Sequence, residues 1–285
     1  MIVASVFCRS CGYDLRGLAT TGSCPECGLE VRETLTHLVD PAASRLPKLN
    51  DPRGVGDGLL GLAVTATLVT LVLVLPSALR LLGAVGLAQS TARHIDPGTA
   101  ALIASGISFV GLWWARLVAR GPAESPRTVA HRDLRRMFVG LGSWTLVLAA
   151  CGLGMLEKPG PLVEAALVVL PMPFAIVGLL GLRGVLDLVG LRSRAYRTAR
   201  SGRQSVDGLV AALAAGAIGL GLAVIGLRLD RGWLETVGHA VALASILLFL
   251  IGLLYLVVNC WWIRSSLRSP PPRLSDLVAP SASTR

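Results

Sequence analysis

The sequence has little charge. Charged residues make up 15% of the chain, compared with about 25% in a typical soluble domain, whereas 53% of the residues are hydrophobic. The sequence also has no phosphate-binding loop, no His-Glu-x-x-His motif and no paired carboxylates, which are patterns that indicate common nucleotide-dependent and hydrolytic enzymes. The low charge argues against an ordinary soluble domain. Because the enzyme motifs are missing as well, we expect the protein not to be an enzyme.

Charge is missing above all from six long stretches. They are residues 58–79, 97–115, 137–156, 165–182, 208–227 and 236–263. A bilayer core about 30 Å thick is crossed by roughly 20 helical residues, and each stretch is long enough. We therefore predict an all-α membrane protein whose six-helix transmembrane domain covers residues 58–264 and lies in the lipid bilayer. No cleavable targeting segment is expected before it, because residues 1–7 are few and carry no basic side chain.

The basic residues are distributed unevenly among the connections. Only five of the 27 Lys and Arg residues lie in three alternate connections: Arg80, Arg93, Lys158, Arg228 and Arg231. The others lie in the N-terminal segment, in the connections after the second and fourth helices, and in the C-terminal tail. Because cytoplasmic segments carry the excess of Lys and Arg, we predict a multi-pass inner-membrane protein with both termini in the cytoplasm. This topology also explains the arginines of residues 192–203, for which contact with anionic lipid headgroups is the alternative.

Two Cys-x-x-Cys pairs stand near the amino terminus. Their cysteines are Cys8, Cys11, Cys24 and Cys27. Each pair is able to place two thiolates on one tetrahedral ion, and a glycine (Gly12 or Gly28) follows each pair, where a positive φ helps to close the turn. We predict a structural Zn²⁺ site in a zinc ribbon over residues 1–37. An iron–sulfur centre is an alternative for the same cysteines, and two disulfides are disfavoured in a reducing cytoplasm.

The segments around these cysteines resemble a known type of protein. The motif CRSCGYDLRG, followed by CPECG, looks like the zinc-ribbon head of bacterial multi-pass membrane proteins. The resemblance covers residues 8–28 and the general layout, but not the spanning helices. Because the four cysteines of such ribbons are the metal ligands, the resemblance implies a structural metal at the same four positions and no defined reaction.

The charge of the ribbon argues against nucleic acid as a partner. Its positively charged side chains are Arg9, Arg16 and Arg32, and its negatively charged carboxylates are Asp14, Glu26, Glu30 and Glu33. Four thiolates on one Zn²⁺ add a further charge of about −2. Attraction to phosphates dominates nucleic-acid binding, and two aromatic residues (Phe7 and Tyr13) are too few for a stacking platform. We therefore do not expect the ribbon to bind nucleic acid.

Two further segments are predicted to lack regular structure. Residues 38–57 have the composition of a linker, because they contain three prolines and are followed or interrupted by glycines. These residues are Pro41, Pro47, Pro52, Gly54, Gly56 and Gly58. Residues 265–285 contain three consecutive prolines and end in a polar run, so a disordered cytoplasmic tail is predicted.

Two patterns within the spans concern helix packing. Pro171 and Pro173 fall inside the stretch 165–182, where they are expected to kink the helix. Broken helices are typical of transporters, but the neighbouring residues are apolar, which favours a kink that serves packing. In the fifth span, small residues at steps of four predict a ridge for close approach of another helix. They are Ala211, Ala215, Gly219 and Ala223.

Ser108 and His239 resemble the serine–histidine pair of rhomboid proteases. However, Ser108 lies in the second span, and the sequence around His239 lacks the glycine-rich frame of that family. We therefore do not predict a catalytic pair.

Two hypotheses for function follow. The first is a non-enzymatic membrane protein that presents its ribbon to the cytoplasm as a protein-interaction or assembly module, with a cytoplasmic protein partner. The alternative is a small-solute transporter or channel subunit whose ribbon is regulatory. The sequence names neither the partner nor the solute, and self-association into a homo-oligomer stays open.

Overall fold

Most of the described part of the chain is helical. The computed structural model describes residues 1–40, 46, 49–84, 97–121, 127–155, 169–199, 204–272 and 274–278. Its helices are α1 (Val31–Leu38), α3 (Pro52–Ala84), α4 (Pro97–Ala119), α5 (Arg127–Met155), α7 (Met172–Gly190), α8 (Arg194–Thr198), α9 (Val206–Arg228), α10 (Gly232–Arg268) and α11 (Leu274–Leu277). In these parts of the chain the only β pairing consists of isolated bridges. The predicted all-α fold class is confirmed.

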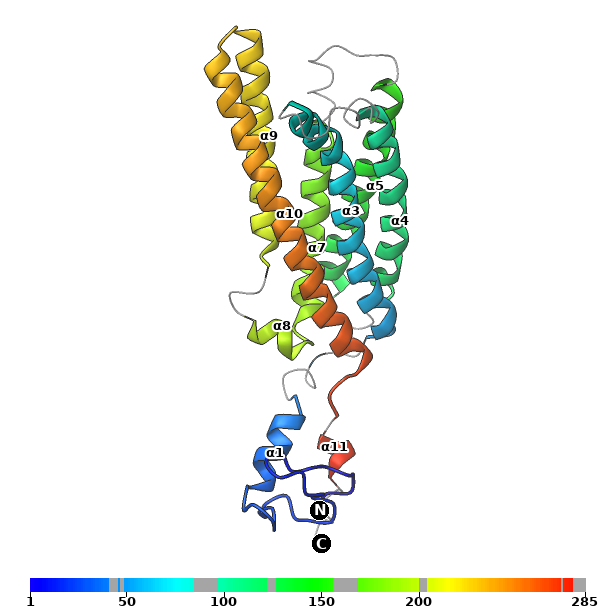
Figure 1. The fold of residues 1–285 in the computed structure, drawn as a ribbon. Coiled ribbons are helices and arrows are strands. Elements are labelled where there is room, and N and C mark those ends of the chain that lie inside the picture. The colour runs from blue at the N-terminus through cyan, green and yellow to red at the C-terminus, as the bar shows by residue number, and fades with distance from the viewer. Residues whose placement is uncertain are drawn as a thin grey trace.

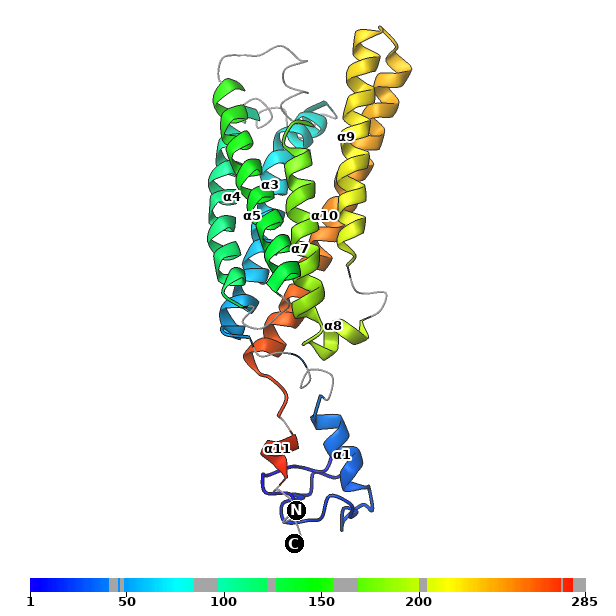
Figure 2. The ribbon, with the colours of Figure 1, turned by 180° about the vertical axis from the view of Figure 1, so that it is seen from behind.

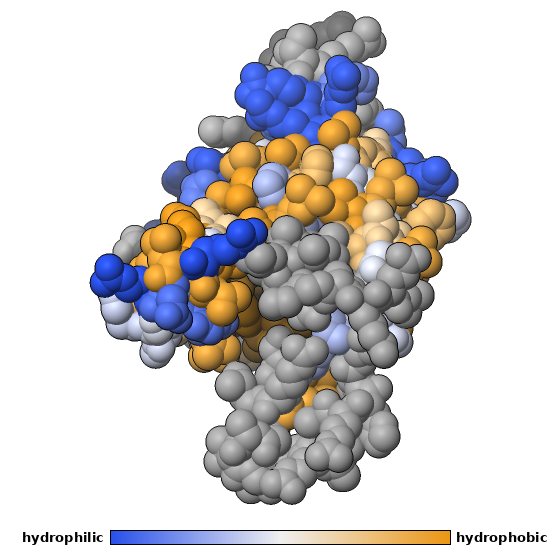
Figure 3. Space-filling model, turned by 90° about the horizontal axis from the view of Figure 1, so that it is seen from above, coloured by the Kyte–Doolittle hydropathy of each residue, from blue (hydrophilic) through white to orange (hydrophobic). Residues whose placement is uncertain are grey.

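Among the described residues, six helices are long and apolar enough to cross a membrane. The candidate spans are Pro52–Pro76, Pro97–Ala119, His131–Gly154, Met172–Gly190, Val206–Arg228 and Gly232–Arg268. They run side by side as one bundle, with the cysteine-containing head and α11 at the same end (Figures 1 and 2). Hydrophobic residues dominate the described surface seen from the opposite end (Figure 3). This arrangement confirms the predicted six spans and is that of a membrane-spanning protein.

The bundle core is largest near the head. Neighbouring helices pack in the order α4, α3, α10 and α9 on one side, and α4, α5 and α7 on the other. Fully buried apolar side chains come from α3, α4, α7, α9 and α10: they include Leu59, Val118, Leu186, Leu209, Leu253, Leu256 and Ile263. Toward the end away from the head, α9 and the first half of α10 diverge from the other helices as a hairpin (Figures 1 and 2).

Small residues allow α9 and α10 to approach closely. A Cβ atom added to Gly219 would lie 2.7 Å from the backbone nitrogen of Ala242, and one added to Gly238 would lie 2.4 Å from that of Ala223. Gly219 and Ala223 of the predicted ridge therefore face α10, whereas Ala211 is exposed. The contact places backbone against backbone, which strengthens packing inside a membrane, where burial of apolar surface drives little association.

Four spans begin earlier than predicted, and the difference is largest for α3 and α5. Pro52, assigned above to a linker, is the first residue of α3, a position where the missing N–H of proline costs no hydrogen bond. The carboxylate of Asp51 accepts a hydrogen bond of 2.8 Å from the backbone N–H of Gly54, which caps the helix. The linker prediction is therefore wrong for residues 52–57. Likewise, α5 begins at Arg127, ten residues before the stretch that starts at 137.

The proline pair does not kink α7. Pro171 caps this helix, and Pro173 lies in its first turn, where its missing N–H would have no helical partner. The carbonyl of Pro171 accepts hydrogen bonds from the N–H groups of Phe174 and Ala175. Val169 is also helical, so the described residues place an interruption of the helix at residues 170–171; the rest of the prediction, which concerns residues 165–168, lies outside them.

Ser108 and His239 have different partners. The Ser108 hydroxyl lies 2.9 Å from that of Thr145 on α5, whereas Nδ1 of His239 lies 3.0 Å from the carbonyl oxygen of Glu235, one turn earlier on α10. Ser108 thus joins two neighbouring spans.

The C-terminal segment is ordered against the head. Helix α10 continues to Arg268, and α11 covers Leu274–Leu277. The backbone N–H of Val3 donates to the carbonyl of Leu277 at 2.9 Å, and Ile2 and Val278 form an isolated antiparallel bridge. This arrangement replaces the predicted disordered tail for residues 265–272 and 274–278.

Candidate metal centre

The head contains two turns of the same geometry. In the first, the N–H of Gly12 donates to the carbonyl of Cys8 at 2.9 Å, and the N–H of Cys8 donates to the carbonyl of Tyr13 at 2.8 Å. In the second, Gly28, Cys24 and Leu29 form the same two bonds, also at 2.9 and 2.8 Å. Gly12 and Gly28 have φ values of 76° and 73°, which only glycine adopts at little cost. Each Cys-x-x-Cys-Gly sequence therefore folds into one metal-binding knuckle.

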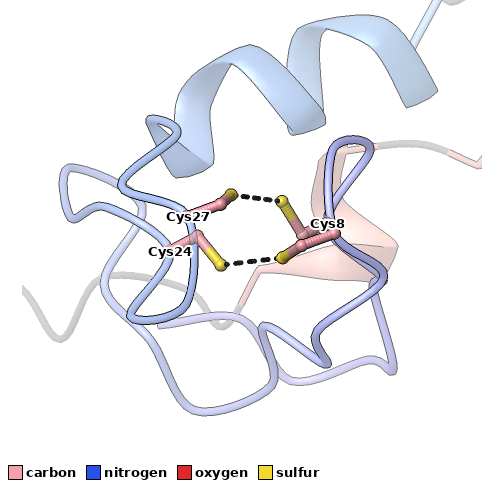
Figure 4. Close-up of side chains that lie close together, drawn as sticks. Cys8, Cys24 and Cys27 are labelled. Atoms are coloured by element: carbon pink, nitrogen blue, oxygen red, sulfur yellow. Dashed lines mark hydrogen bonds between the residues drawn. The ribbon is translucent and has the colours of Figure 1, made fainter.

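The knuckles bring four thiols to one point. The Sγ atoms of the predicted ligands Cys8, Cys11, Cys24 and Cys27 all lie within 4.8 Å of one another. Across the two knuckles, Sγ of Cys8 lies 3.6 Å from that of Cys27, and Sγ of Cys11 lies 3.6 Å from that of Cys24 (Figure 4). Metal–sulfur bonds of about 2.3 Å in a tetrahedron require S···S separations of about 3.8 Å. The four cysteines thus fit a tetrahedral metal ion, and none of them forms a disulfide.

The thiols of the first knuckle differ in acidity. Backbone N–H groups of Cys11 and Ser10 lower the pKa of Cys8 to about 6. The N–H of Tyr13 lowers the pKa of Cys11, but burial and the thiols of Cys27, Cys24 and Cys8 together raise it to about 12. A second negative charge is thus costly once the first thiolate has formed. A divalent cation at the centre removes this repulsion, which agrees with the closed donor set.

The tail completes the apolar core of the head. Side chains of the knuckles and of α1 pack with one residue of α11: the buried members are Ile2, Val6, Cys8, Leu15, Cys24, Val31, Leu35 and Leu277. Leu277 is 7% exposed, whereas Leu274, one turn earlier on α11, is 53% exposed. The head is therefore built from both ends of the chain, and residues 1–37 alone do not contain its whole core. The role of Leu277 was not predicted, because the few apolar residues after the proline run (Leu274, Leu277 and Val278) are too few for a periodic signal.

A short helix joins the head to the bundle. The Ser193 hydroxyl caps α8 by accepting a hydrogen bond from the N–H of Tyr196 at 3.3 Å, and it also lies 3.2 Å from the carbonyl of Trp262 on α10. From α8, Arg197 contacts the carboxylate of Asp40 at 2.5 Å, and Arg194 donates to the carbonyl of His37 at 2.8 Å. Topology alone was sufficient to explain the presence of these arginines in the sequence. In the structure they also bind the end of α1 and the residues that follow it.

An ion cluster ties the first span to the last. Asp57 of α3 contacts Arg264 at 2.5 Å and Arg268 at 2.9 Å, both on α10. Arg264 also lies over the ring of Trp261, 5.4 Å from its centroid. The end of α10 is therefore fixed where the chain leaves the bundle for α11. The head thus has two attachments to the bundle: α8, which contacts His37 and Asp40, and α10, which leads to α11.

Comparison of the chain with protein-family models, with curated proteins and with solved structures finds no match.

Proposed function

We propose that the protein presents its head, folded around one structural Zn²⁺, to the cytoplasm as a protein-interaction module fixed to the membrane. Zinc is the ion that four thiolates in two knuckles most often hold as a closed structural site. A closed site leaves no position for water or substrate, so the ion supports the fold and no reaction is assigned to it. The resemblance of residues 8–28 to zinc-ribbon heads agrees with this role.

The main observation that supports this proposal is the exposed aromatic surface of the first knuckle. Phe7 is 62% exposed and Tyr13 is 40% exposed, and both flank the metal-bound turn. The equivalent positions of the second knuckle hold Ser23 and Leu29. Exposed aromatic residues on a rigid support are typical centres of protein interfaces, because they offer large contact areas at low entropic cost. The asymmetry between two otherwise similar knuckles therefore points to the first as the contact surface.

The side of the membrane follows from charge. Only five Lys and Arg residues lie in the connections of the far end, including Arg228 and Arg231, so the head end has the excess expected of the cytoplasmic side. Thr198 and Gly232 are exposed at opposite ends of the bundle. With a membrane-impermeant thiol reagent on intact cells, we expect labelling of Gly232→Cys and protection of Thr198→Cys until the cells are permeabilised. The reverse pattern would place the head outside the cytoplasm.

Photo-crosslinking tests the contact surface. A benzophenone analogue of phenylalanine at position 7 is expected to give one adduct of defined mass in living cells, and the same analogue at position 23 is expected to give at least tenfold less. Tyr13→Ser in the position-7 protein should reduce the adduct to a similar extent, because half of the aromatic surface is lost. Equal adducts from positions 7 and 23, or none from position 7, would contradict the proposal. An adduct of two copies of the chain would identify self-association as the contact.

The proline pair does not by itself favour the transporter alternative. Pro171 and Pro173 stand at the start of α7, so the proline pair serves helix initiation in the described part of this span. The contacts of α8 and α10 hold the head in one orientation relative to the bundle. A head held in this way agrees with the proposal that the membrane protein presents the first knuckle to a partner.

A further inference from the structure

A cavity of about 710 Å³ lies between α5 and α7, near the head. Leu46, from the segment that follows the head, covers part of it. Gly184 of α7 leaves space for α5: a Cβ atom at this position would lie 2.0 Å from Oδ2 of Asp133. The carboxylate of Asp133 is therefore held against the backbone of α7 at the cavity wall, and its side chain is only 14% exposed.

The charged groups of the cavity wall lie at its head end. There the wall carries three guanidinium groups and two carboxylates, from Arg136, Arg183, Arg192, Asp133 and Asp187, together with Leu188 and Leu191. Toward the middle of α7 the wall consists of Val177 and Leu180, which are 36% and 38% exposed. At 1.5 Å per residue, Val177 lies about 15 Å along the helix from Asp187. This distance matches much of one acyl chain, and these two partly exposed apolar side chains belong to a helix that is long and apolar enough to cross a membrane.

The charged groups at the head end are only loosely paired with one another. Arg136 lies 3.7 Å from Asp133, and Arg183 lies 4.0 Å from Asp187, although Arg183 also contacts Asp207 at 2.6 Å. Pairs at such distances contribute little to stability when the guanidinium groups are about half exposed, as those of Arg136 and Arg183 are. Each guanidinium has five donors, so these arginines retain donors for a ligand beside their carboxylate contacts.

We propose that this cavity binds a phospholipid whose headgroup contains a phosphate and a primary ammonium. Guanidinium groups bind phosphate oxygens through paired charge-assisted hydrogen bonds, and the carboxylates of Asp133 and Asp187 accept from the ammonium. The acyl chain then lies along Leu180 and Val177. A purely anionic headgroup has no ammonium to donate to the two carboxylates. A choline headgroup has a cation, but this cation has no N–H to donate. The alternating charges of the wall therefore select phosphatidylethanolamine.

Native mass spectrometry of the full-length protein tests this site. With equimolar phosphatidylethanolamine, phosphatidylglycerol and phosphatidylcholine, we expect one phosphatidylethanolamine per chain, retained at least tenfold more than either competitor. Asp187→Asn should remove most of the preference over phosphatidylglycerol, because the ammonium loses an acceptor. Arg136→Gln should lower retention of all three lipids. Arg228→Gln, at the opposite end of the bundle, serves as the matched control and should retain the preference of the wild type.

Three results would overturn the proposal. The first is equal retention of the three lipids by the wild-type protein, and the second is a preference that Asp187→Asn leaves unchanged. The third is complete displacement of the lipid by soluble glycerophosphoethanolamine at comparable concentration, which would assign the cavity to a water-soluble phosphate compound, with no contribution from the apolar wall.

Discussion

Replacing Cys24 with Ser is expected to release the metal and unfold the head, while the six spans stay inserted and helical. Cys24 is 2% exposed, and its thiol lies 3.6 Å from that of Cys11, so its loss removes both a ligand and a part of the head core. Metal binding contributes about 10–16 kcal/mol to the folding of small zinc domains. The head has fewer than 50 described residues, too few to fold stably on apolar burial alone.

The full chain is needed for this test, because Leu277 is part of the head core and a peptide of residues 1–40 lacks it. We expect the metal content to fall from one ion per chain to less than a tenth of that value, and proteolysis to cut within residues 1–40 at low protease concentrations. The helix content by circular dichroism should change little, since the spans bury their own surfaces. Cys151→Ala, on α5 and away from the centre, is the matched control and should keep its metal.

Two outcomes would contradict this separation of head and bundle. Retention of the metal by the Cys24→Ser protein would show that three thiolates suffice for the site. Loss of insertion or of most helix content would show that the contacts of α8 and α10 with the head are needed for the bundle to form. Chelation of the metal in the wild-type protein should reproduce the proteolysis pattern and leave the bundle intact.

The spans and the cysteine cluster were predictable because their signals are local. A span must be about 20 residues long and nearly free of charge, and a four-thiolate knuckle pair needs two short cysteine repeats, each followed by a residue that tolerates positive φ. Each condition is met within one stretch of sequence. The helix ends were less predictable, because α5 carries Arg132, Arg135 and Arg136 within its first turns, and a helix is able to extend beyond the bilayer core where the charge is tolerated.

The contacts of the head were not predictable because they join distant parts of the chain. Leu277 packs on residues that precede it by more than 240 positions, and Arg197 contacts Asp40 across 157 positions. An arginine in a cytoplasmic loop satisfies the charge rule for topology whether or not it has a partner, so its second role leaves no mark on the sequence. The aromatic pair at the first knuckle was visible in the sequence, but its exposure was not.

Replacing Gly140 with Ala is expected to destabilise the bundle by about 1–3 kcal/mol through overpacking. A Cβ atom at this position would lie 2.2 Å from the backbone nitrogen of Gly178 and 2.7 Å from the carbonyl oxygen of Phe174, both on α7. Because these atoms belong to the backbone, no change of side-chain rotamer relieves the collision, and α5 must move away from α7. In detergent solution, the midpoint of thermal unfolding should fall by several degrees.

The matched control lies two residues further along the same helix. A Cβ atom at Gly142 would have no heavy atom within 4 Å, so Gly142→Ala adds a methyl group to open space and removes a flexible residue from a helix interior. That change is expected to stabilise by about 0.5–1 kcal/mol, and the two substitutions should therefore have opposite signs. Gly140→Leu should be at least as damaging as Gly140→Ala, because the collision already involves Cβ. Equal midpoints for Gly140→Ala and Gly142→Ala would show that α5 and α7 do not touch at Gly178, and that the close helix contact beside the cavity is absent from the folded protein.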